Sequence, residues 1–280
     1  IKDKNEKMTS FSLFLLKREL QIILKQKLFY VAAIFFVIIT SFFHFIAGNF
    51  FSLDLGSSSL SQFFLSMPYI CILVIPTLTM NVWNLKNDTF ESFPISTTKK
   101  VFVKFLALIL LFLFILIFTL PVVFFTNSFG NVSFSSVFTG YFVIFLYGSC
   151  VISLCLLIFS FFQNKALAFF SAAVILAIIN SSHFLPLYFN LPSFLASFAR
   201  SLSVSWHFDA ASKGILDTRD CLFYVILSAL FCVLTVYHIN SRKKGNFNKQ
   251  VIFFPIIALL LILNSTLYYT RLDLTSEKQF

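Results

Sequence analysis

Residues 105–125 read FLALILLFLFILIFTLPVVFF, a run in which Thr119 is the only polar side chain. A helix needs about 20 mostly apolar residues to cross the hydrocarbon core of a bilayer. Each Leu, Ile, Phe or Val at the centre of such a helix favours insertion by roughly 0.3–0.6 kcal/mol. The stretch therefore predicts a membrane span and excludes a soluble fold.

Similar apolar runs recur along the 280 residues, of which 59% are hydrophobic and 11% charged. This composition is typical of an all-α polytopic membrane protein. Prolines at positions 76, 121 and 255 fall inside predicted spans, where we expect kinks. The seven predicted spans are residues 28–47, 63–82, 102–125, 137–162, 166–188, 221–239 and 251–269.

The 21 basic residues are distributed unevenly about these spans. One side holds seven in the N-terminal segment, four in residues 83–104, Lys165, and four in residues 240–250. The positive-inside bias makes this side cytoplasmic, which places the N-terminus inside a bacterial cytoplasmic membrane and residue 280 outside. Because the charges are dispersed at span ends, the net charge of +10 does not indicate binding to nucleic acid. The other side holds Arg200, Lys213, Arg219, Arg271 and Lys278.

Several classes of function lack the residues that they require. No Asp, Glu, Lys, Arg or His lies between Phe105 and Asn164, and His44 and His238 lie near span ends. Ion-coupled carriers, proton pumps and voltage sensors need ionisable groups inside the membrane. The five cysteines form no CxxC pattern, and no GxxxxGK[ST] loop is present. We therefore predict no catalytic, cofactor or metal residue in this chain, and no hydrolysis of ATP by it.

Residues 1–27 are predicted to form a cytoplasmic segment with an amphipathic helix along the inner membrane surface. Lys17, Gln21 and Lys25 fall on one helical face. Leu13, Leu16, Leu20 and Ile23 fall on another. The alternative is that this helix simply continues the first span, which the charges of Lys17, Arg18 and nearby lysines disfavour.

Two connections are longer than a turn between spans requires. The cytoplasmic one covers residues 83–104, where a short helix near Asp88 must end before Pro94 and Ser96 is a candidate cap for the next helix. The external one covers residues 183–220. In it, Pro186 and Pro192 are expected to break the chain before short helices at or dipping into the outer interface. The residues with helical spacing there are Phe194, Leu195, Phe198, Ala199 and Leu202.

Short motifs around the first two spans are informative together. Residues 17–20 read KREL, residues 30–31 read YV and residues 75–80 read IPTLTM. These resemble conserved starts and ends of spans in the permease subunit of type-2 ABC exporters, most closely the gliding-motility permease group. The resemblance implies a six-span permease domain, here residues 28–242, preceded by a surface helix that includes Lys17, Arg18 and Glu19.

The cytoplasmic connection carries a further part of the resemblance. Asp88, Thr89, Phe90, Glu91 and Pro94 are similar to the loop that couples the family's permease to its ATPase. Asp88 stands where the family has glycine, and the spacing from Glu91 to Pro94 is shorter than in the family. The resemblance implies that these five residues contact the ATPase.

The external connection also resembles the corresponding part of this permease family. Residues 207–208 read HF and residues 213–220 read KGILDTRD, which resembles the family's entry to its sixth span. The resemblance implies an outer re-entrant segment that includes His207, Asp217, Arg219 and Asp220. The residues alone favour a helix cap and a salt bridge for the last three, with a substrate contact as the alternative.

Residues 243–280 contain the seventh predicted span and the run YTRLDLTSEKQF. This run resembles the start of the gliding-motility auxiliary subunit, in which a single span leads to an extracytoplasmic domain. We expect the two subunits to be fused here and the native polypeptide to continue into that domain. The alternative is a simple anchor with a short tail.

The resemblance as a whole implies a permease of an ATP-driven transporter, with ATP and Mg bound by a separate cytoplasmic ATPase dimer. A second permease copy, identical or different, and membrane lipids are the other implied partners. The alternatives are a structural membrane anchor of an envelope or motility complex, and an intramembrane enzyme, for which no nucleophile–base spacing is present. An apolar pathway fits lipids, hydrophobic peptides or mechanical coupling, and the sequence does not select among these.

Overall fold

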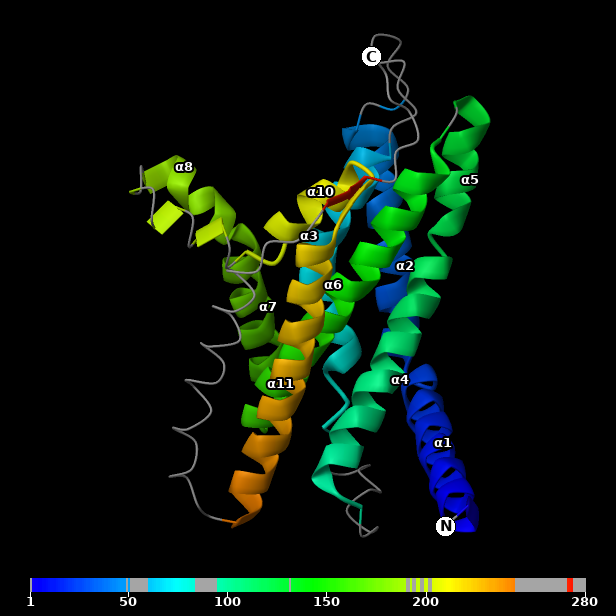
Figure 1. Cartoon of the computed structure of the whole chain (residues 1–280), viewed down its shortest axis with the longest axis vertical. Coiled ribbons are helices and arrows are strands. Elements are labelled where there is room, and N and C mark those ends of the chain that lie inside the picture. The colour runs from blue at the N-terminus through cyan, green and yellow to red at the C-terminus, as the bar shows by residue number, and fades with distance from the viewer. Residues whose placement is uncertain are drawn as a thin grey trace.

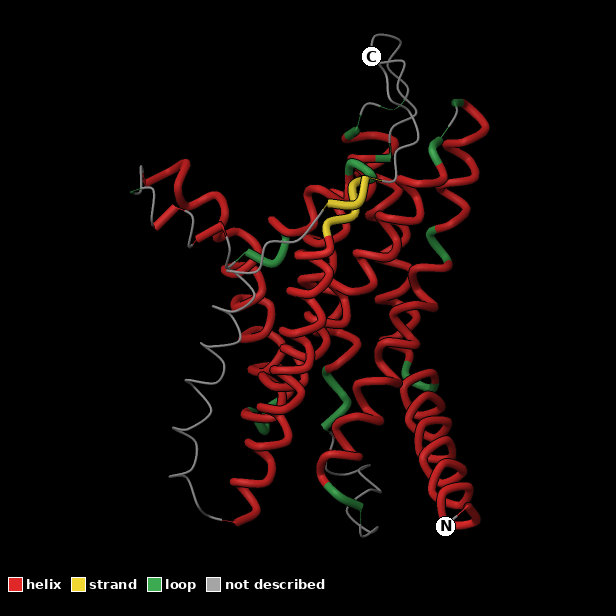
Figure 2. The backbone as a smooth tube through the Cα atoms, viewed as in Figure 1, coloured by secondary structure: helices red, strands yellow, loops and turns green. Residues whose placement is uncertain are grey.

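The computed structural model describes residues 2–48, 50, 60–83, 95–130, 132–189, 192, 195–196, 199–200, 203–244 and 271–273. These residues form a bundle of long helices with one pair of very short strands (Figures 1 and 2). The long helices are α1 (Lys2–Leu24), α2 (Lys27–Phe42), α3 (Ser61–Thr79), α4 (Thr97–Ile117), α5 (Leu120–Phe129), α6 (Phe134–Phe161), α7 (Lys165–Ser181) and α11 (Thr218–Lys244). The short elements are η1 (Phe43–Ala47), η3 (Ser182–Phe184), α8 (Leu185–Phe189), η4 (Trp206–Phe208), α10 (Asp209–Ser212), β1 (Ile215–Asp217) and β2 (Arg271–Asp273).

Six stretches of the described chain are helical, long and apolar enough to cross a membrane. They are Lys27–Ala47, Ser61–Thr79, Thr97–Phe129, Phe134–Phe161, Lys165–Phe189 and Thr218–Arg242. Each overlaps one of the first six predicted spans. The chain is thus a helical polytopic membrane protein, while the seventh predicted span, residues 251–269, lies outside the described residues.

Helix α6 is the central helix of the bundle and contacts α3, α4, α7 and α11. Of the residues in the most apolar 18-residue stretch of α6, 78% are buried. The corresponding share is 28% in the spans that contain α2 and α7. Two glycines allow this close packing. A Cβ atom at Gly140 would lie 2.5 Å from the ring of Phe64, and one at Gly148 would lie 2.1 Å from the ring of Phe112. Small residues permit such approach of membrane helices.

The third span is interrupted before Pro121. The amides of Phe118 and Thr119 bond to carbonyls three residues earlier, and α5 begins at Leu120 with Pro121 in its first turn. The Thr119 hydroxyl donates to the Leu116 carbonyl at 2.7 Å and lies 2.8 Å from the hydroxyl of Tyr141. A kink was predicted at Pro121, where the helix is interrupted. Helix α3, by contrast, runs without an interruption through Pro68 and Pro76, and the kink predicted at Pro76 stays a prediction.

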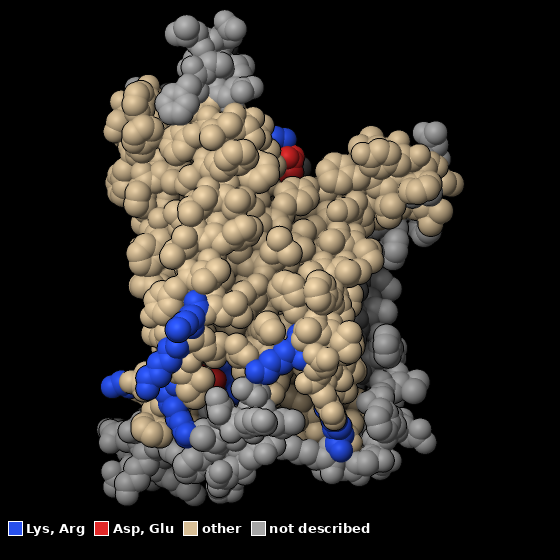
Figure 3. Space-filling view, turned by 180° about the vertical axis from the view of Figure 1, so that it is seen from behind, with Lys and Arg blue, Asp and Glu red and all other residues tan. Residues whose placement is uncertain are grey.

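The charged side chains separate toward the two ends of the bundle. Helix α1, the start of α4 and the end of α11 lie at the lower end in Figure 1, which we call the basic end. Figure 3 shows basic side chains gathered there, below a broad belt that carries no charge on the visible face. The opposite end holds α8, α10 and the strands.

The strands β1 and β2 pair antiparallel, with Leu216 opposite Leu272 (Figure 2). Helix α11 ends at Lys244 at the basic end, whereas β2 lies at the opposite end (Figure 1). The described residues on either side of the predicted seventh span therefore lie at opposite ends of the bundle.

The external connection is interrupted before Pro186, as predicted. Helix α7 ends at Ser181, η3 follows, and Pro186 lies in the first turn of α8, where a helix needs no backbone N–H from it. Leu195 and Ala199 are helical as predicted, and Ala199 is buried. Phe194, Phe198 and Leu202 lie outside the described residues.

Candidate functional site

The predicted coupling residues Asp88, Thr89, Phe90, Glu91 and Pro94 lie outside the described residues. The structure does show the two points at which residues 84–94 join the bundle. Residues 81–83 precede the segment, and residues 95–104 follow it. We call these two attachments, together with the part of α1 that they contact, the junction.

An ion pair inside the protein joins α1 to α4 in the junction. Lys104 Nζ lies 3.4 Å from Glu19 Oε1, and the side chains of both residues are at most 6% exposed. The same ammonium donates to the Val82 carbonyl at 2.7 Å and lies 5.3 Å from the centre of the Trp83 ring. One buried cation therefore bridges α1, the residues before the segment and the helix after it.

Further contacts extend from the residues before the segment. Asn81 Nδ2 donates to Gln26 Oε1 at 2.9 Å, and Lys165 Nζ donates to Asn81 Oδ1 at 2.8 Å. The Trp83 indole donates to the Leu156 carbonyl on α6 at 3.2 Å. Residues 81–83 are thus bonded to Gln26 at the start of α2, to α6 and to the start of α7.

The residues after the segment also pack on α1. Leu15 of α1 and Val103 of α4 form a small buried cluster, against which Leu16 and Ile95 pack. Ile95 is the first described residue after the segment. The attachment after the segment therefore contacts α1 through this cluster and the ion pair, whereas the attachment before it bonds to Gln26, between α1 and α2.

The exposure of its side chains shows which face of α1 meets the protein. Lys17 is exposed as predicted, Arg18 is half-buried, and Glu19 is 4% exposed. Leu13, on the predicted apolar face, is 65% exposed. The face that packs on the protein carries Leu15, Glu19 and Ile23, because Glu19 pairs with Lys104 and Leu15 packs on Val103.

Helix α1 does not continue the first span. Gln26 has extended backbone angles (φ −83°, ψ 124°), and the span begins at Lys27. The structure therefore favours the separate helix over the alternative. Its placement on a membrane surface stays a prediction.

At the opposite end, the predicted outer residues divide into two roles. Asp217 caps α11, because its Oδ1 accepts from the backbone amide of Arg219 at 2.9 Å. Asp220 pairs with His207, with 2.6 Å between Oδ1 and Nδ1, and the His207 ring stacks on Phe223. The side chains of Asp217 and Asp220 therefore both bind other groups of the protein. A contact with a substrate stays an untested alternative.

A neutral polar network connects α6 with α3 and α7. The hydroxyl of Tyr147, which is fully buried, lies 2.9 Å from the Pro68 carbonyl and 3.0 Å from Asn180 Oδ1. Its single proton can serve only one of these acceptors at a time. Asn180 Nδ2 donates to the Leu176 carbonyl at 2.9 Å, which fixes the orientation of the amide.

The network continues into the external connection. The hydroxyls of Ser203 and Ser205 both donate to the backbone carbonyl of Asn180, at 3.1 and 2.8 Å. His183 Nδ1 lies 2.9 Å from Ser203 Oγ. We call this set, with Tyr147, the neutral network.

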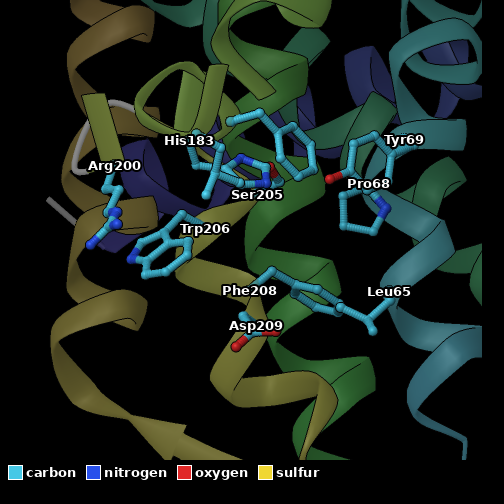
Figure 4. A pocket seen from close by; sticks show the side chains of 11 residues that line it. Leu65, Pro68, Tyr69, His183, Arg200, Ser205, Trp206, Phe208 and Asp209 are labelled. Atoms are coloured by element: carbon cyan, nitrogen blue, oxygen red, sulfur yellow. The ribbon is translucent and has the colours of Figure 1, made fainter. Parts of the chain in front are cut away.

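Beside the neutral network lies a cavity of about 400 Å³ (Figure 4). Its walls come from α3, from the end of α7 with α8, and from residues 200–209. Phe208 and Pro68 form a buried floor, whereas Trp206 and Leu187 at the rim are 44% and 71% exposed. This volume lies within the usual range for ligand pockets, about 300–1,000 Å³.

Sequence reasoning missed the junction residues Lys104, Asn81 and Trp83, and it missed Tyr147 with Asn180. One signal was available for the first group, since Lys104 is a charged residue inside a predicted span. Tyr147 and Asn180 carry no comparable signal in the sequence.

Comparison of the chain with models of protein families, with curated proteins and with solved structures finds no match.

Proposed function

We propose that the chain is the permease subunit of an ATP-driven transporter of the type-2 ABC class, working as an exporter. ATP and Mg bind to a separate cytoplasmic ATPase dimer, and a second permease copy completes the pathway. The motifs in residues 17–20, 75–80 and 88–94 support this proposal. The permease domain covers residues 28–242, followed by a seventh span.

The junction is the observation that carries the proposal. A loop that transmits force from an ATPase must be attached to the helices that it moves. Residues 84–94 are flanked by Asn81, which bonds to Gln26 between α1 and α2, and by the start of α4, where Lys104 pairs with Glu19 of α1. The hydrogen bonds of Trp83 and Lys165 extend these attachments to α6 and α7.

The chemistry of the junction suits a mechanical role. A buried ion pair adds little net stability, because desolvation offsets the Coulomb attraction. It does hold two elements in one relative position, since an alternative arrangement leaves a buried charge without its partner. A displacement of residues 84–94 would therefore move α1 and α4 together.

The proposal is tested by purifying the native complex and measuring ATP hydrolysis in nanodiscs. We expect a P-loop ATPase to co-purify with the chain and its activity to depend on the permease. Glu91→Ala should preserve assembly while reducing the permease-dependent hydrolysis. Asp209→Ala removes one carboxylate at the opposite end of the bundle and serves as the matched control. This variant should retain the permease-dependent ATP hydrolysis.

Two results would contradict the proposal. Recovery of the chain without any ATP-hydrolysing partner would favour a structural anchor. So would an ATPase whose rate is the same with and without the permease. Unchanged hydrolysis in Glu91→Ala alone would remove only the coupling role of that residue.

A further inference from the structure

The cavity at the opposite end combines an apolar floor with a charged rim. Leu65 and Phe208 meet along its lower wall, and Arg200 and Trp206 stand at its edge (Figure 4). Because the cavity lies next to the ends of α3 and α7, its opening is at the level where the predicted spans end and the membrane–water interface begins. Tryptophan and arginine at this level are typical of contacts with lipid headgroups.

The charge at the rim is positive. Arg200 lies over the Trp206 ring, 5.5 Å from its centre, and among the described residues no carboxylate lies within ion-pair distance of it. Asp209 also lines the cavity, but Lys213 Nζ pairs with it at 2.7 Å. The unbalanced charge is therefore the Arg200 guanidinium, which suits a phosphate or carboxylate.

The neutral network supplies a second polar group. The hydroxyls of Ser203 and Ser205 lie within hydrogen-bond distance of the Asn180 carbonyl, and Ser203 Oγ lies 2.9 Å from His183 Nδ1. With its proton on Nδ1, the His183 imidazole donates to Ser203 and keeps the lone pair of Nε2 for a ligand. The Tyr69 hydroxyl, which is hydrogen-bonded to Ser205, lies at the same side of the cavity (Figure 4). His183 thereby offers an acceptor to a hydroxyl-bearing ligand.

The geometry points to a binding site for an anionic amphiphile. Its phosphate or carboxylate lies on Arg200, a headgroup hydroxyl donates to His183 Nε2, and the start of its acyl chain lies on Leu65 and Phe208. This site goes beyond the proposed transport function, because binding there requires neither an ATPase nor a second copy. A cavity of about 400 Å³ admits a headgroup and the first part of one chain rather than a whole two-chain lipid.

Trp206 provides a direct probe, because the chain contains only two tryptophans. In the Trp83→Phe variant, Trp206 is the sole emitter. The purified variant in maltoside micelles is titrated with phosphatidylglycerol that carries brominated acyl chains, and with phosphatidylcholine that carries the same chains. We expect saturable quenching with an apparent affinity about fivefold higher for phosphatidylglycerol, as one arginine near a headgroup provides.

Arg200→Gln in the same background should remove the preference for phosphatidylglycerol. Arg219→Gln removes an exposed cation at the same end that does not line the cavity, and should retain the preference. Leu65→Phe should weaken binding of both lipids by filling the floor. Free glycerol phosphate distinguishes the source of the anion, since it should not compete at the concentrations at which the lipid binds.

Equal quenching by the two lipids, or a preference that survives Arg200→Gln, would overturn the site. Effective competition by glycerol phosphate would overturn the role of the acyl chain. Should Trp83→Phe fail to fold, native mass spectrometry of the unmodified chain and of Arg200→Gln gives the same comparison, as the ratio of retained phosphatidylglycerol to phosphatidylcholine.

Discussion

The junction at the basic end and the neutral network near the opposite end connect a similar number of helices by different chemistry. The junction centres on the charged pair of Glu19 and Lys104. The neutral network uses only hydroxyl, amide, imidazole and carbonyl groups, centred on Tyr147 and Asn180. The central residues of both sets, Glu19 with Lys104 and Tyr147 with Asn180, are buried.

The difference follows the cost of burying a charge. A charged side chain deep in a bilayer is expensive, so polar links between membrane helices are mostly neutral. Lys104 lies in the first third of its span, near the end where the other basic residues gather. The comparison indicates that charge is used where it positions the elements next to the predicted coupling loop, and neutral bonds where the helices only need to stay packed.

The largest effect is expected from removing one charge of the junction. Lys104→Met removes the cation that lies 3.4 Å from the buried Glu19 carboxylate, and should lower the free energy of unfolding by about 3–5 kcal/mol. The measurement is equilibrium unfolding by SDS in mixed micelles, followed by circular dichroism. Lys99→Met, which removes an exposed lysine from the same helix, is the matched control and should change it by less than about 0.5 kcal/mol.

The double variant Glu19→Leu with Lys104→Met sharpens this test. It removes both charges and should recover most of the lost stability, because an apolar pair of similar volume needs no desolvation. A double variant as unstable as Lys104→Met alone would show that the ion pair is not the source of the effect.

A smaller effect is expected from the packing beside the neutral network. Gly148→Ala places a methyl group against the Phe112 ring and should cost about 1–3 kcal/mol in the same unfolding assay. Phe112→Leu in combination should relieve part of this cost. If the alanine is tolerated without change, α6 and α4 do not approach as closely as the structure shows.

The smallest effect is expected from one neutral hydrogen bond. Tyr147→Phe removes the hydroxyl shared by Pro68 and Asn180, and should cost about 0.6–1.7 kcal/mol, the range found for hydrogen bonds between membrane helices. Tyr188→Phe makes the same change at an exposed position and should have no measurable effect. A loss as large as that of Lys104→Met would contradict the distinction between the two regions.

Much of the fold was predictable because its signals are local. The first six spans, the interruption at Pro121 and the cap at Asp217 each depend on residues within one stretch of chain. The interruption before Pro186 is equally local, because proline is compatible with the first turn of a new helix and not with the continuation of the old one. The burial of Glu19 was not predictable, because its partner Lys104 lies on another helix.

The amino-acid sequence establishes that the chain crosses a membrane several times, and it predicts which side each connection faces. These properties follow from the length of apolar runs and the position of basic residues, since a backbone in lipid must satisfy its hydrogen bonds within each helix. The packing of the helices is what brings Glu19 to Lys104, Tyr147 to Asn180 and Arg200 to the edge of a cavity. Those partners are far apart along the chain or depend on which helical faces pack together, and periodicity within one helix does not specify the face of another.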